Sequence, residues 1–522
     1  MLRSCLLICI LVATVTLTTS VAATPSSSYR AAVVQFHTQH VNGPDGKIRD
    51  PLSSIVMNLN RMNNHVINAV SQGAEIVVFP ELAAGRAEIN RVECTKYSIV
   101  VPDPMKASEP LIPIAMPSEW QNENIALTLM SKIAEENNVV IVIGFVEREP
   151  SSVTNSTADH IYNSAIVLDS DGSVLQVYRK SHLFSEKLTG AFDRAVPPEQ
   201  RTFTTRFGVT FGIFICFEVL FEDPTIELIK QGITHFVYPT SWVNTPPFQS
   251  ANQIQQGFSR TFNVTFLAAN NAAGITKSGS GIYQNGEPLA YYFDPDKSEV
   301  ANEKVIIADI PINNSNAIVP QKVAALSPPK FYSNSSSLEP LFGYDLFYPH
   351  PGQNGTLHAT FEDLTCSATY KIAPVEYGNV WSAPERYALV AAHRWIWFGQ
   401  PMHIEFCSIA KCVENYACVI LDPISENVYG TNVKFESATL VANYPTDAVV
   451  YPLFATNNGQ LVSPSSVIVN DEISSAPGNV IKTISFDSSN ANHQPISLLN
   501  LGFFRAGFPD SGDTPTTKPP RK

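Results

Sequence analysis

The stretch "GIFICFEVLFEDP" at residues 212–224 places a cysteine, Cys216, at the end of an apolar run. Aromatic and β-branched residues without polar interruption are typical of a strand that is buried on both faces. Asp223 and Pro224 are suited to open the next helix, as its cap and its first residue. In folds that alternate strands and helices, the carboxyl edge of the sheet gathers the catalytic side chains. Cys216 is therefore a candidate nucleophile, with an inert core thiol and half of a disulfide as the alternatives.

The same alternation of apolar strands and amphipathic helices extends over residues 29–310. The predicted strands include residues 30–36, 74–80, 139–147, 233–239 and 264–270, and the predicted helices include residues 58–73, 124–138 and 252–262. Asp171-Gly172 joins two further β runs as a hairpin. Because nearly continuous apolar strands must be covered on both faces, the predicted class is α/β with helices outside the sheets.

The composition changes after this region. Residues 28–312 are predicted to be a first, catalytic domain, and residues 313–337, rich in Asn, Ser and Pro, a linker. Runs such as "RYALVAAHRWIWF" and "VKFESATLVA" then lack long helical periods. Residues 338–508 are therefore predicted to be a smaller β-rich domain, followed by a polar tail at 509–522.

The first residues of the chain indicate the compartment, and the net charge limits the class of partner. Residues 1–22 place Arg3 before a short apolar stretch that ends in small residues, which is the pattern of a secretory signal peptide. No later stretch is long and apolar enough to span a membrane. The net charge of -13 argues against a nucleic-acid partner, because such binding needs a basic surface. We expect a secreted, extracellular protein.

Sequons and cysteines agree with export. Candidate glycosylation sites are Asn155, Asn263, Asn313, Asn334 and Asn354. The four cysteines of the last third, which are predicted to form two disulfides in one of three pairings, are Cys366, Cys407, Cys412 and Cys418. A zinc site that includes His403 is the alternative, but the spacing lacks the close C-x-x-C pairs of structural zinc sites.

Two further candidates lie at strand ends, as Cys216 does. Glu81 follows "VVFP", and Lys180 follows "VLQVYR". Glu81 would take the thiol proton, return it to a leaving amine and later activate water. Lys180 would favour the thiolate and, with the backbone N–H of Phe217, stabilise an oxyanion. Together with Cys216 as the acyl-accepting nucleophile, these groups match the chemistry of amide hydrolysis.

Other residue types give competing readings of the same region. His182, next to Lys180, could pair with the cysteine instead, whereas His235 lies within a predicted strand and is expected to be a core histidine. Glu186 is either an auxiliary carboxylate or a solvated loop charge. A serine hydrolase is disfavoured, because "SGSGIY" at residues 278–283 lacks the G-x-S-x-G elbow and is predicted to be a loop.

In combination, the motifs resemble the nitrilase-type carbon-nitrogen hydrolases, and among them the secreted vanin (pantetheinase) and biotinidase branch. The resemblance rests on "FPE", "YRKSHLF", "GIFICFEVLFEDP", "YPTSWVN", "LAANN" and "SGSGIY", and in the β-rich end on "RYALVAAHR" and "HIEFCSIAKC". It implies a four-layer αββα sandwich, a Glu-Lys-Cys triad formed by Glu81, Lys180 and Cys216, no metal or organic cofactor, and hydrolysis of a small linear amide. Trp242, in "YPTSWVN", is a candidate for contact with the substrate, although a buried aromatic is more often part of the core.

Two residues depart from the pattern of this branch. Leu82 stands where the branch usually has an acidic residue, and Glu218 where it usually has aspartate. Neither takes part in the expected triad chemistry. The expected substrate is pantetheine or a biotinyl amide. Transfer of the acyl group to an amine and a catalytically inactive carrier protein remain the alternative functions.

Overall fold

The computed structural model describes most of the chain. The described residues are 27–41, 50–85, 90–102, 109–154, 157–184, 190–195, 201–245, 249–272, 274–294, 302–312, 317–318, 342–374, 385–397, 401–412, 431–445, 449–456, 461, 466–473, 479–488, 495–496 and 498–507.

Two six-stranded sheets form the first domain. The first has the order β12 (Lys304–Pro311), β1 (Ser28–Gln35), β2 (Ile76–Val78), β3 (Val140–Glu149), β4 (His160–Leu168) and β5 (Val174–Arg179). The second has the order β6 (Thr202–Thr204), β7 (Thr210–Ile213), β8 (His235–Pro239), β9 (Thr265–Ala269), β10 (Ser280–Gln284) and β11 (Glu287–Tyr292). Each sheet has three parallel strands in the same places, β1 to β3 and β7 to β9, with antiparallel strands outside them.

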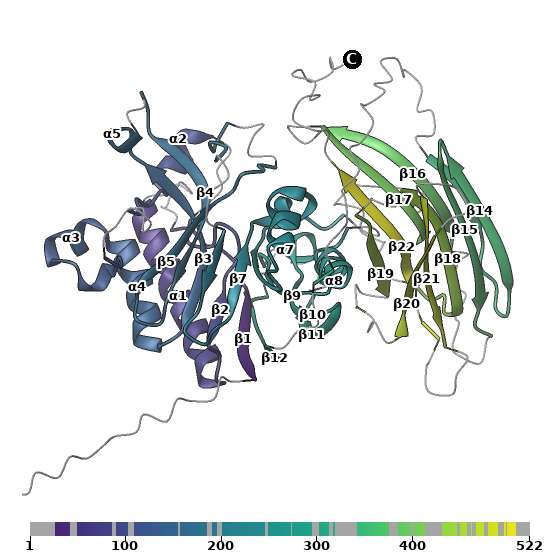
Figure 1. Ribbon diagram of the computed structural model, residues 1–522, viewed down its shortest axis with the longest axis horizontal. Helices are drawn as coiled ribbons and strands as arrows, with labels where there is room; N and C mark the ends of the chain where they lie inside the picture. The colour runs from purple at the N-terminus through teal and green to yellow at the C-terminus, as the bar shows by residue number, and fades with distance from the viewer. Residues whose placement is uncertain are drawn as a thin grey trace, which may run out of the picture.

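The alternation of side chains along the strands explains the layers. On β1, Ala31 and Val33 face the core shared with the second sheet, whereas Ala32 and Val34 face the helices. The long helices α1 (Pro51–Ser71) and α4 (Ile125–Asn137) cover that outer face, and α8 (Ala251–Phe262) covers the second sheet (Figure 1). The predicted α/β class and the four-layer αββα sandwich are confirmed.

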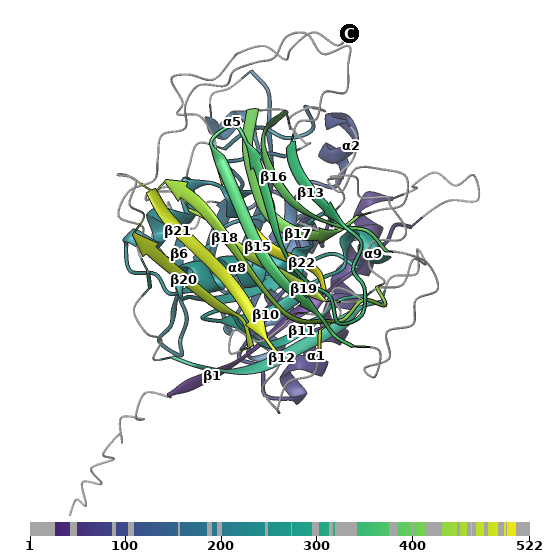
Figure 2. The ribbon, with the colours of Figure 1, turned by 90° about the vertical axis from the view of Figure 1, so that its right-hand side faces the viewer.

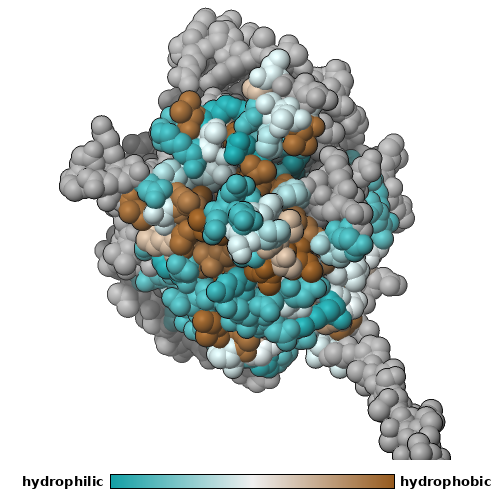
Figure 3. Space-filling model, turned by 90° about the vertical axis from the view of Figure 1, so that its left-hand side faces the viewer, coloured by the Kyte–Doolittle hydropathy of each residue, from teal (hydrophilic) through white to brown (hydrophobic). Residues whose placement is uncertain are grey.

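The remaining helical elements are short. They are α2 (Arg91–Lys96), α3 (Ser118–Glu123), α5 (Ser151–Thr154), α7 (Glu227–Lys230), α9 (Gly274–Lys277), η1 (Pro113–Ala115), η2 (Cys216–Leu220) and η3 (Glu222–Ile226). Seen from the side of α3, the described surface mixes hydrophilic and hydrophobic patches (Figure 3).

Local chemistry sets where the helices begin. Asp50 accepts a hydrogen bond from the backbone N–H of Leu52 at the start of α1, with proline in the first position. The helix start predicted at Asp223 and Pro224 is present, because the backbone of Asp223 is non-helical and helical values begin at Pro224. The expected side-chain cap is wrong, because the Asp223 carboxylate binds the guanidinium of Arg201. A nearby cation competes better for a carboxylate than a neutral backbone N–H does.

The predicted loop at residues 278–283 is also wrong. Ser280 to Tyr283 belong to β10, which pairs with β9 on one side and with β11 on the other. Glycine and serine have low strand propensity, but the two neighbouring strands satisfy the backbone groups of β10. Tertiary pairing therefore outweighs local composition at this point.

The second domain consists of two antiparallel five-stranded sheets, which confirms the predicted β-rich class. One sheet has the order β13 (Phe342–Phe347), β16 (Tyr387–Trp397), β17 (Pro401–Lys411), β22 (Leu498–Gly507) and β19 (Tyr451–Thr456). The other, seen face-on in Figure 2, has the order β14 (Asn354–Phe361), β15 (Leu364–Ile372), β18 (Phe435–Pro445), β21 (Asn479–Asp487) and β20 (Ile468–Ile473).

A disulfide joins these two sheets. Cys366 on β15 is bonded to Cys407 on β17, and both residues are completely buried. Cys412 is also disulfide-bonded, whereas Cys418 lies outside the described residues. The side chain of His403, the zinc ligand of the alternative reading, is likewise not described.

The β-rich domain docks on α8 of the first domain (Figure 1). The helix carries a glycine, Gly257, where β19 crosses it: a Cβ atom there would lie 3.1 Å from the carbonyl oxygen of Pro452 and 3.2 Å from the Cβ of Tyr451. Phe258 and Phe504 belong to one hydrophobic core that runs through both domains. One sheet of the second domain therefore packs into the core of the first, and a separate core lies between the two sheets of the second domain.

Several predictions fall outside the described residues: the signal peptide at 1–22, most of the linker, the tail, and the sequons at Asn155, Asn313 and Asn334. Of the other sequons, Asn354 is exposed at the start of β14, and Asn263 is half-buried at the end of α8. No helix within the described ranges is long and apolar enough to cross a membrane.

The tight packing at Gly257 predicts the effect of a larger side chain. Gly257→Leu should lower the free energy of unfolding by about 1–3 kcal/mol, because the leucine must push β19 away from α8. Replacement of glycine alone would favour the helix by about 1 kcal/mol, so a loss of stability identifies the packing clash. Denaturant unfolding measures the difference. Asn60→Leu, at an exposed position of α1, is the control and should stay within about 0.5 kcal/mol of wild type. A Gly257→Leu protein as stable as wild type would contradict the close docking.

Candidate active site

The three predicted catalytic residues lie at one edge of the double sheet. Glu81 follows β2 and Lys180 follows β5, both in the first sheet, whereas Cys216 follows β7 in the second. The Lys180 Nζ atom lies 2.7 Å from Glu81 Oε1, and the two side chains are 1% and 3% exposed. Asn163, on β4, donates a second hydrogen bond of 2.7 Å to the same oxygen. The ion pair is thus buried and held by an amide.

Close packing fixes the turn that carries Glu81. A Cβ atom on Gly144 of β3 would lie 2.3 Å from the carbonyl oxygen of Pro80 and 2.7 Å from the Cα of Glu81. The backbone N–H of Ala84 donates to the Gly144 carbonyl at 3.0 Å. Leu82 adopts a left-handed backbone with φ of 55°, which is strained for a branched residue. The turn therefore depends on a glycine in the neighbouring strand.

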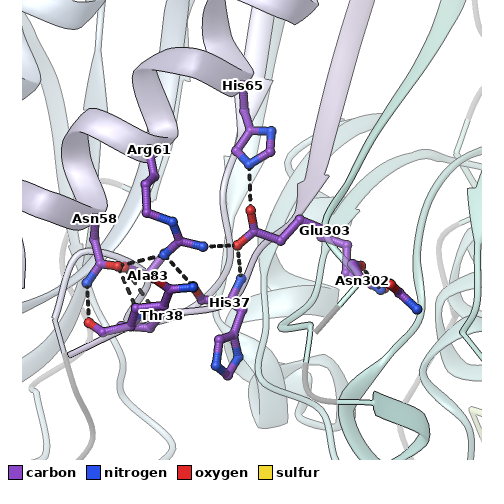
Figure 4. Close-up of polar contacts among 10 residues, drawn as sticks. His37, Thr38, Asn58, Arg61, His65, Ala83, Asn302 and Glu303 are labelled. Carbon is purple, nitrogen blue, oxygen red and sulfur yellow. Dashed lines mark hydrogen bonds and ion pairs between the residues drawn. The ribbon is translucent and has the colours of Figure 1, made fainter. Parts of the chain in front are cut away.

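The other side of this turn rests on the segment that follows β1. Thr38 donates a hydrogen bond of 3.3 Å to the carbonyl oxygen of Ala83. Figure 4 shows how α1 and Glu303 hold this segment. Glu303 accepts from the backbone N–H of His37 at 3.0 Å, and it also binds the side chains of Arg61 and His65. Burial of this carboxylate is offset by its donors, so the pKa of Glu303 is lowered.

Cys216 begins the short helix η2 with a left-handed backbone, φ 50°. Such a conformation is costly for a non-glycine residue and persists only where the surroundings enforce it. The hydroxyl of Tyr238 on β8 donates to the carbonyl oxygen of Cys216 at 2.7 Å. The hydroxyl of Tyr451, from the second domain, donates to the carbonyl oxygen of Val219 at 3.0 Å. Two buried tyrosines thus satisfy carbonyl groups of η2.

The Cys216 thiol is not in a disulfide, and its environment keeps it protonated. Burial, followed by the negative charge of Glu81, raises its pKa to about 12, whereas the charge of Lys180 lowers it. The hydroxyl of Thr240 and the backbone N–H of Ser241 also favour the thiolate. Thr240 Oγ1 has no partner at hydrogen-bond distance and angle among the described residues, so its effect on the thiol comes from proximity. Both members of the ion pair therefore act on the sulfur.

Phe217 and Trp242 lie beside these groups. Phe217 is the second residue of η2, and its backbone N–H is the predicted oxyanion donor. Trp242 is 8% exposed, and its indole N–H donates to the carbonyl oxygen of Gln249 at 3.0 Å while its backbone N–H binds Asn270. These contacts give Trp242 a structural role in the loop after β8; its contact with a substrate stays a prediction.

The histidines do not pair with Cys216. The ring of His182 stacks on Phe221 at 3.7 Å, and burial lowers its pKa to about 3. His235, the first residue of β8, is buried as expected, but its Nε2 has no hydrogen-bond partner among the described residues. Burial lowers its pKa to about 4. Glu186 lies outside the described residues.

Sequence reasoning missed Asn163, Thr240 and Ser241 as members of the site. Thr240 and Ser241 directly follow β8, so the rule that located Cys216 at a strand end would also have found them. Asn163 lies within β4, where nothing in the local sequence distinguishes it. The pairing of β4 with β5 brings Asn163 next to Lys180. The backbone N–H of Lys180 donates to the backbone carbonyl oxygen of Asn163 at 2.9 Å.

The part of the chain that the structure describes contains no cluster of three or more His, Cys, Asp or Glu residues that could hold a metal ion. The site as described consists of a carboxylate, an ammonium group, a thiol and the hydrogen-bond donors around them. This set can move a proton and form a covalent bond through sulfur.

The contact at Gly144 predicts that a methyl group there displaces Glu81. Gly144→Ala should lower the turnover of an amide about 100-fold, because a shift near 1 Å in a catalytic group has this effect. Turnover is measured per folded molecule, with the folded fraction taken from denaturant unfolding. Gly208→Ala is the control for backbone strain without a clash: nothing lies within 4 Å of the added Cβ, but φ is 82°, so stability should fall while turnover per folded molecule is unchanged. Unchanged turnover in Gly144→Ala would show that the turn does not depend on this contact.

The environment of the thiol predicts its titration. Because the Cys216 pKa is raised to about 12, the folded protein should show no thiolate absorbance from this residue at pH 7–9. The signal is the ultraviolet difference between wild type and Cys216→Ser. Glu81→Gln removes a negative charge and should move the ionisation to lower pH, whereas Lys180→Met should move it to higher pH. A step near pH 8.5 in wild type, where free cysteine ionises, would contradict the buried state of the thiol.

Comparisons with known proteins match both domains to known families. The carbon-nitrogen hydrolase family matches residues 30–313, and the vanin C-terminal domain matches residues 340–502. A biotinidase of Takifugu rubripes is 31% identical over 297 residues, which cover 55% of this chain and 57% of that protein. The pantetheinase of Homo sapiens is 27% identical over 421 residues, 79% of this chain and 78% of that protein.

Two further matches come from an insect and from yeast. Vanin-like protein 1 of Drosophila melanogaster is 37% identical over 228 residues, 42% of this chain and 38% of that protein. Among solved structures, a nitrilase-superfamily protein of Saccharomyces cerevisiae matches with 20% identity and a TM-score of 0.42, covering 55% of this chain and 91% of that chain. The family match spans more than half of the sequence and includes Glu81, Lys180 and Cys216. The chain belongs to the carbon-nitrogen hydrolase family, and the domain that follows is a vanin C-terminal domain.

Proposed function

We propose that the protein is a secreted amidase that hydrolyses a small linear amide through an acyl-enzyme on Cys216. The observation that carries this proposal is the buried pair of Glu81 and Lys180, whose charges both act on the thiol. A buried ion pair is costly to desolvate and contributes little to stability. Catalysis explains why the Glu81–Lys180 pair lies beside the Cys216 thiol: the two groups act on the thiol proton and on the oxyanion.

The first half of the reaction forms the acyl-enzyme. Cys216 Sγ attacks the amide carbon while Glu81 takes the thiol proton, and a carbon-sulfur bond forms. Lys180 and the backbone N–H of Phe217 stabilise the oxyanion of the tetrahedral intermediate. When the intermediate collapses, the carbon-nitrogen bond breaks and Glu81 returns the proton to the leaving amine.

The second half releases the acid. Glu81 takes a proton from water, the hydroxide attacks the thioester carbon, and a second oxyanion forms at the same donors. The carbon-sulfur bond then breaks, the thiolate recovers its proton, and the carboxylic acid leaves. Because the resting thiol is protonated, the proton transfer to Glu81 must accompany the attack on the substrate.

The relatives suggest the class of substrate. Proteins named pantetheinase and biotinidase match this chain over long stretches, so we propose pantetheine as the leading substrate and a biotinyl amide as the alternative. The disulfide between Cys366 and Cys407 supports export, because disulfides persist in oxidising compartments. An amine in place of water would turn the same acyl-enzyme into an acyltransferase.

A panel of amides tests the proposal. Wild type should release amine from pantetheine or from biotinyl-lysine, and Cys216→Ala should lose at least about 1,000-fold in kcat, because no other group replaces the nucleophile. Formation of hydroxamate in the presence of hydroxylamine would measure transfer to an amine acceptor.

Two results would reject this assignment. Turnover that persists in Cys216→Ala would exclude the cysteine as nucleophile. If wild type binds these amides, as measured by calorimetry, but releases no amine from any of them, the carrier alternative is favoured over the enzyme.

A further inference from the structure

The catalytic groups come from two different sheets. Glu81 and Lys180 are attached to the first sheet, and Cys216 is attached to the second. The hydrogen-bond ladders run within each sheet. A backbone bridge between Phe36 and Asn271, with a bond of 3.0 Å from the Ala272 N–H to the Phe36 carbonyl, joins the ends of β1 and β9, but not the segments that carry Lys180 and Cys216. The separation between Lys180 and Cys216 therefore needs a contact that crosses between the sheets at the catalytic edge.

Glu218 makes such a contact. It is the third residue of η2, two positions after Cys216, and it is completely buried. Its Oε2 accepts from the backbone N–H of Ile215 and from the hydroxyl of Tyr178, both at 2.8 Å. Its Oε1 accepts from Ser181, through both the backbone N–H and the hydroxyl at 2.7 Å.

A fifth donor, the backbone N–H of His182, lies 3.2 Å from Oε1. Tyr178 precedes Lys180 by two residues, and Ser181 follows it. The single carboxylate thus binds the chain on both sides of Lys180, and through Ile215 it also binds the residue that precedes Cys216.

The cost of burying this carboxylate indicates that it has a specific task. No lysine or arginine of the described residues forms an ion pair with it, so hydrogen bonds alone compensate for the lost hydration. Burial is the largest effect on its titration and raises the pKa of Glu218 in spite of five donors. An apolar side chain at this position would avoid that cost but would leave the five donors unpaired, so the carboxylate and the segments that donate to it depend on each other.

We propose that Glu218 is a positioning residue that joins the Lys180 segment of the first sheet to the Cys216 segment of the second and so sets the distance between ammonium group and thiol. This inference rests on the proposed function of Cys216. The charges that act on the thiol are those of Glu81 and Lys180, so Glu218 works through geometry.

Two substitutions separate geometry from charge. Backbone N–H groups point at both carboxylate oxygens, from Ser181 at Oε1 and from Ile215 at Oε2. An amide has one accepting oxygen, so Glu218→Gln must turn its NH₂ group toward one of these donors and break the bridge. Glu218→Asp keeps the charge but is one methylene shorter, so it cannot reach both segments without moving one of them.

The experiment measures amide turnover and the rate at which iodoacetamide alkylates Cys216, both per folded molecule. Glu218→Gln should lower kcat about 100-fold with KM changed less than about threefold, as expected for a misplaced catalytic group. Alkylation should slow at least about tenfold, because moving Lys180 away leaves the thiol more strongly protonated. Glu218→Asp should show the same losses, partly reduced. Tyr178→Phe removes one neutral donor and should lose less than about tenfold.

Glu405→Gln is the matched control. Glu405 is a buried carboxylate whose bonds to Arg505 join neighbouring strands of one sheet in the second domain. Its substitution should lower thermal stability and leave kcat and alkylation per folded molecule unchanged.

The two readouts keep this inference separate from the proposed function. If Glu218→Gln retains kcat and alkylation within about threefold of wild type, the positioning role is excluded. If wild type hydrolyses no amide, the proposed function fails, and the alkylation rate alone then decides whether Glu218 positions Lys180 against Cys216.

Discussion

The buried ion pair between Lys180 and Glu81 is the interaction on which the site depends. Two charges that are almost fully removed from water stabilise each other only while both are present and both keep their hydrogen bonds. Loss of one partner would leave the other charge buried and unpaired, at a cost of about 3–5 kcal/mol. Asn163 orients the carboxylate, and the packing of Gly144 against the Glu81 turn fixes its backbone. The supporting contacts follow from the need to hold this pair next to a sulfur.

In the proposed reaction, the position of the pair explains how a protonated thiol acts as the nucleophile. A negative charge beside Cys216 disfavours the thiolate, and a positive charge favours it, so the two partly cancel and burial dominates. The resting sulfur is neutral and is protected from adventitious ionisation. In the proposed mechanism the sulfur reacts only when a substrate carbonyl is available, because bond formation and proton transfer to Glu81 then occur together.

Local patterns along the chain predicted the α/β class and the strand-end positions of the three candidates, whereas the four-layer sandwich and the triad were implied by the resemblance to a family. Apolar strands alternate with helices, and Glu81, Lys180 and Cys216 each follow such a strand. The features that were missed depend on which strands are neighbours. Asn163 reaches Glu81 because β3 pairs with β2 on one side and with β4 on the other, and residues 280–283 form a strand because β9 and β11 flank them. Glu218 was noted as a departure from a family pattern, but its five donors come from segments more than 30 residues away as well as from its own turn.

The short helix η2 shows how two domains share one local structure. A helix of five residues leaves carbonyl groups that its own backbone cannot satisfy. Tyr238 of the first domain supplies a hydroxyl to the Cys216 carbonyl, and Tyr451 of the second supplies one to the Val219 carbonyl. Tyr451 reaches this position because Gly257 allows β19 to pack closely on α8. The strained backbone of Cys216 is therefore held by groups from both domains, and the β-rich domain is part of the structure that presents this residue.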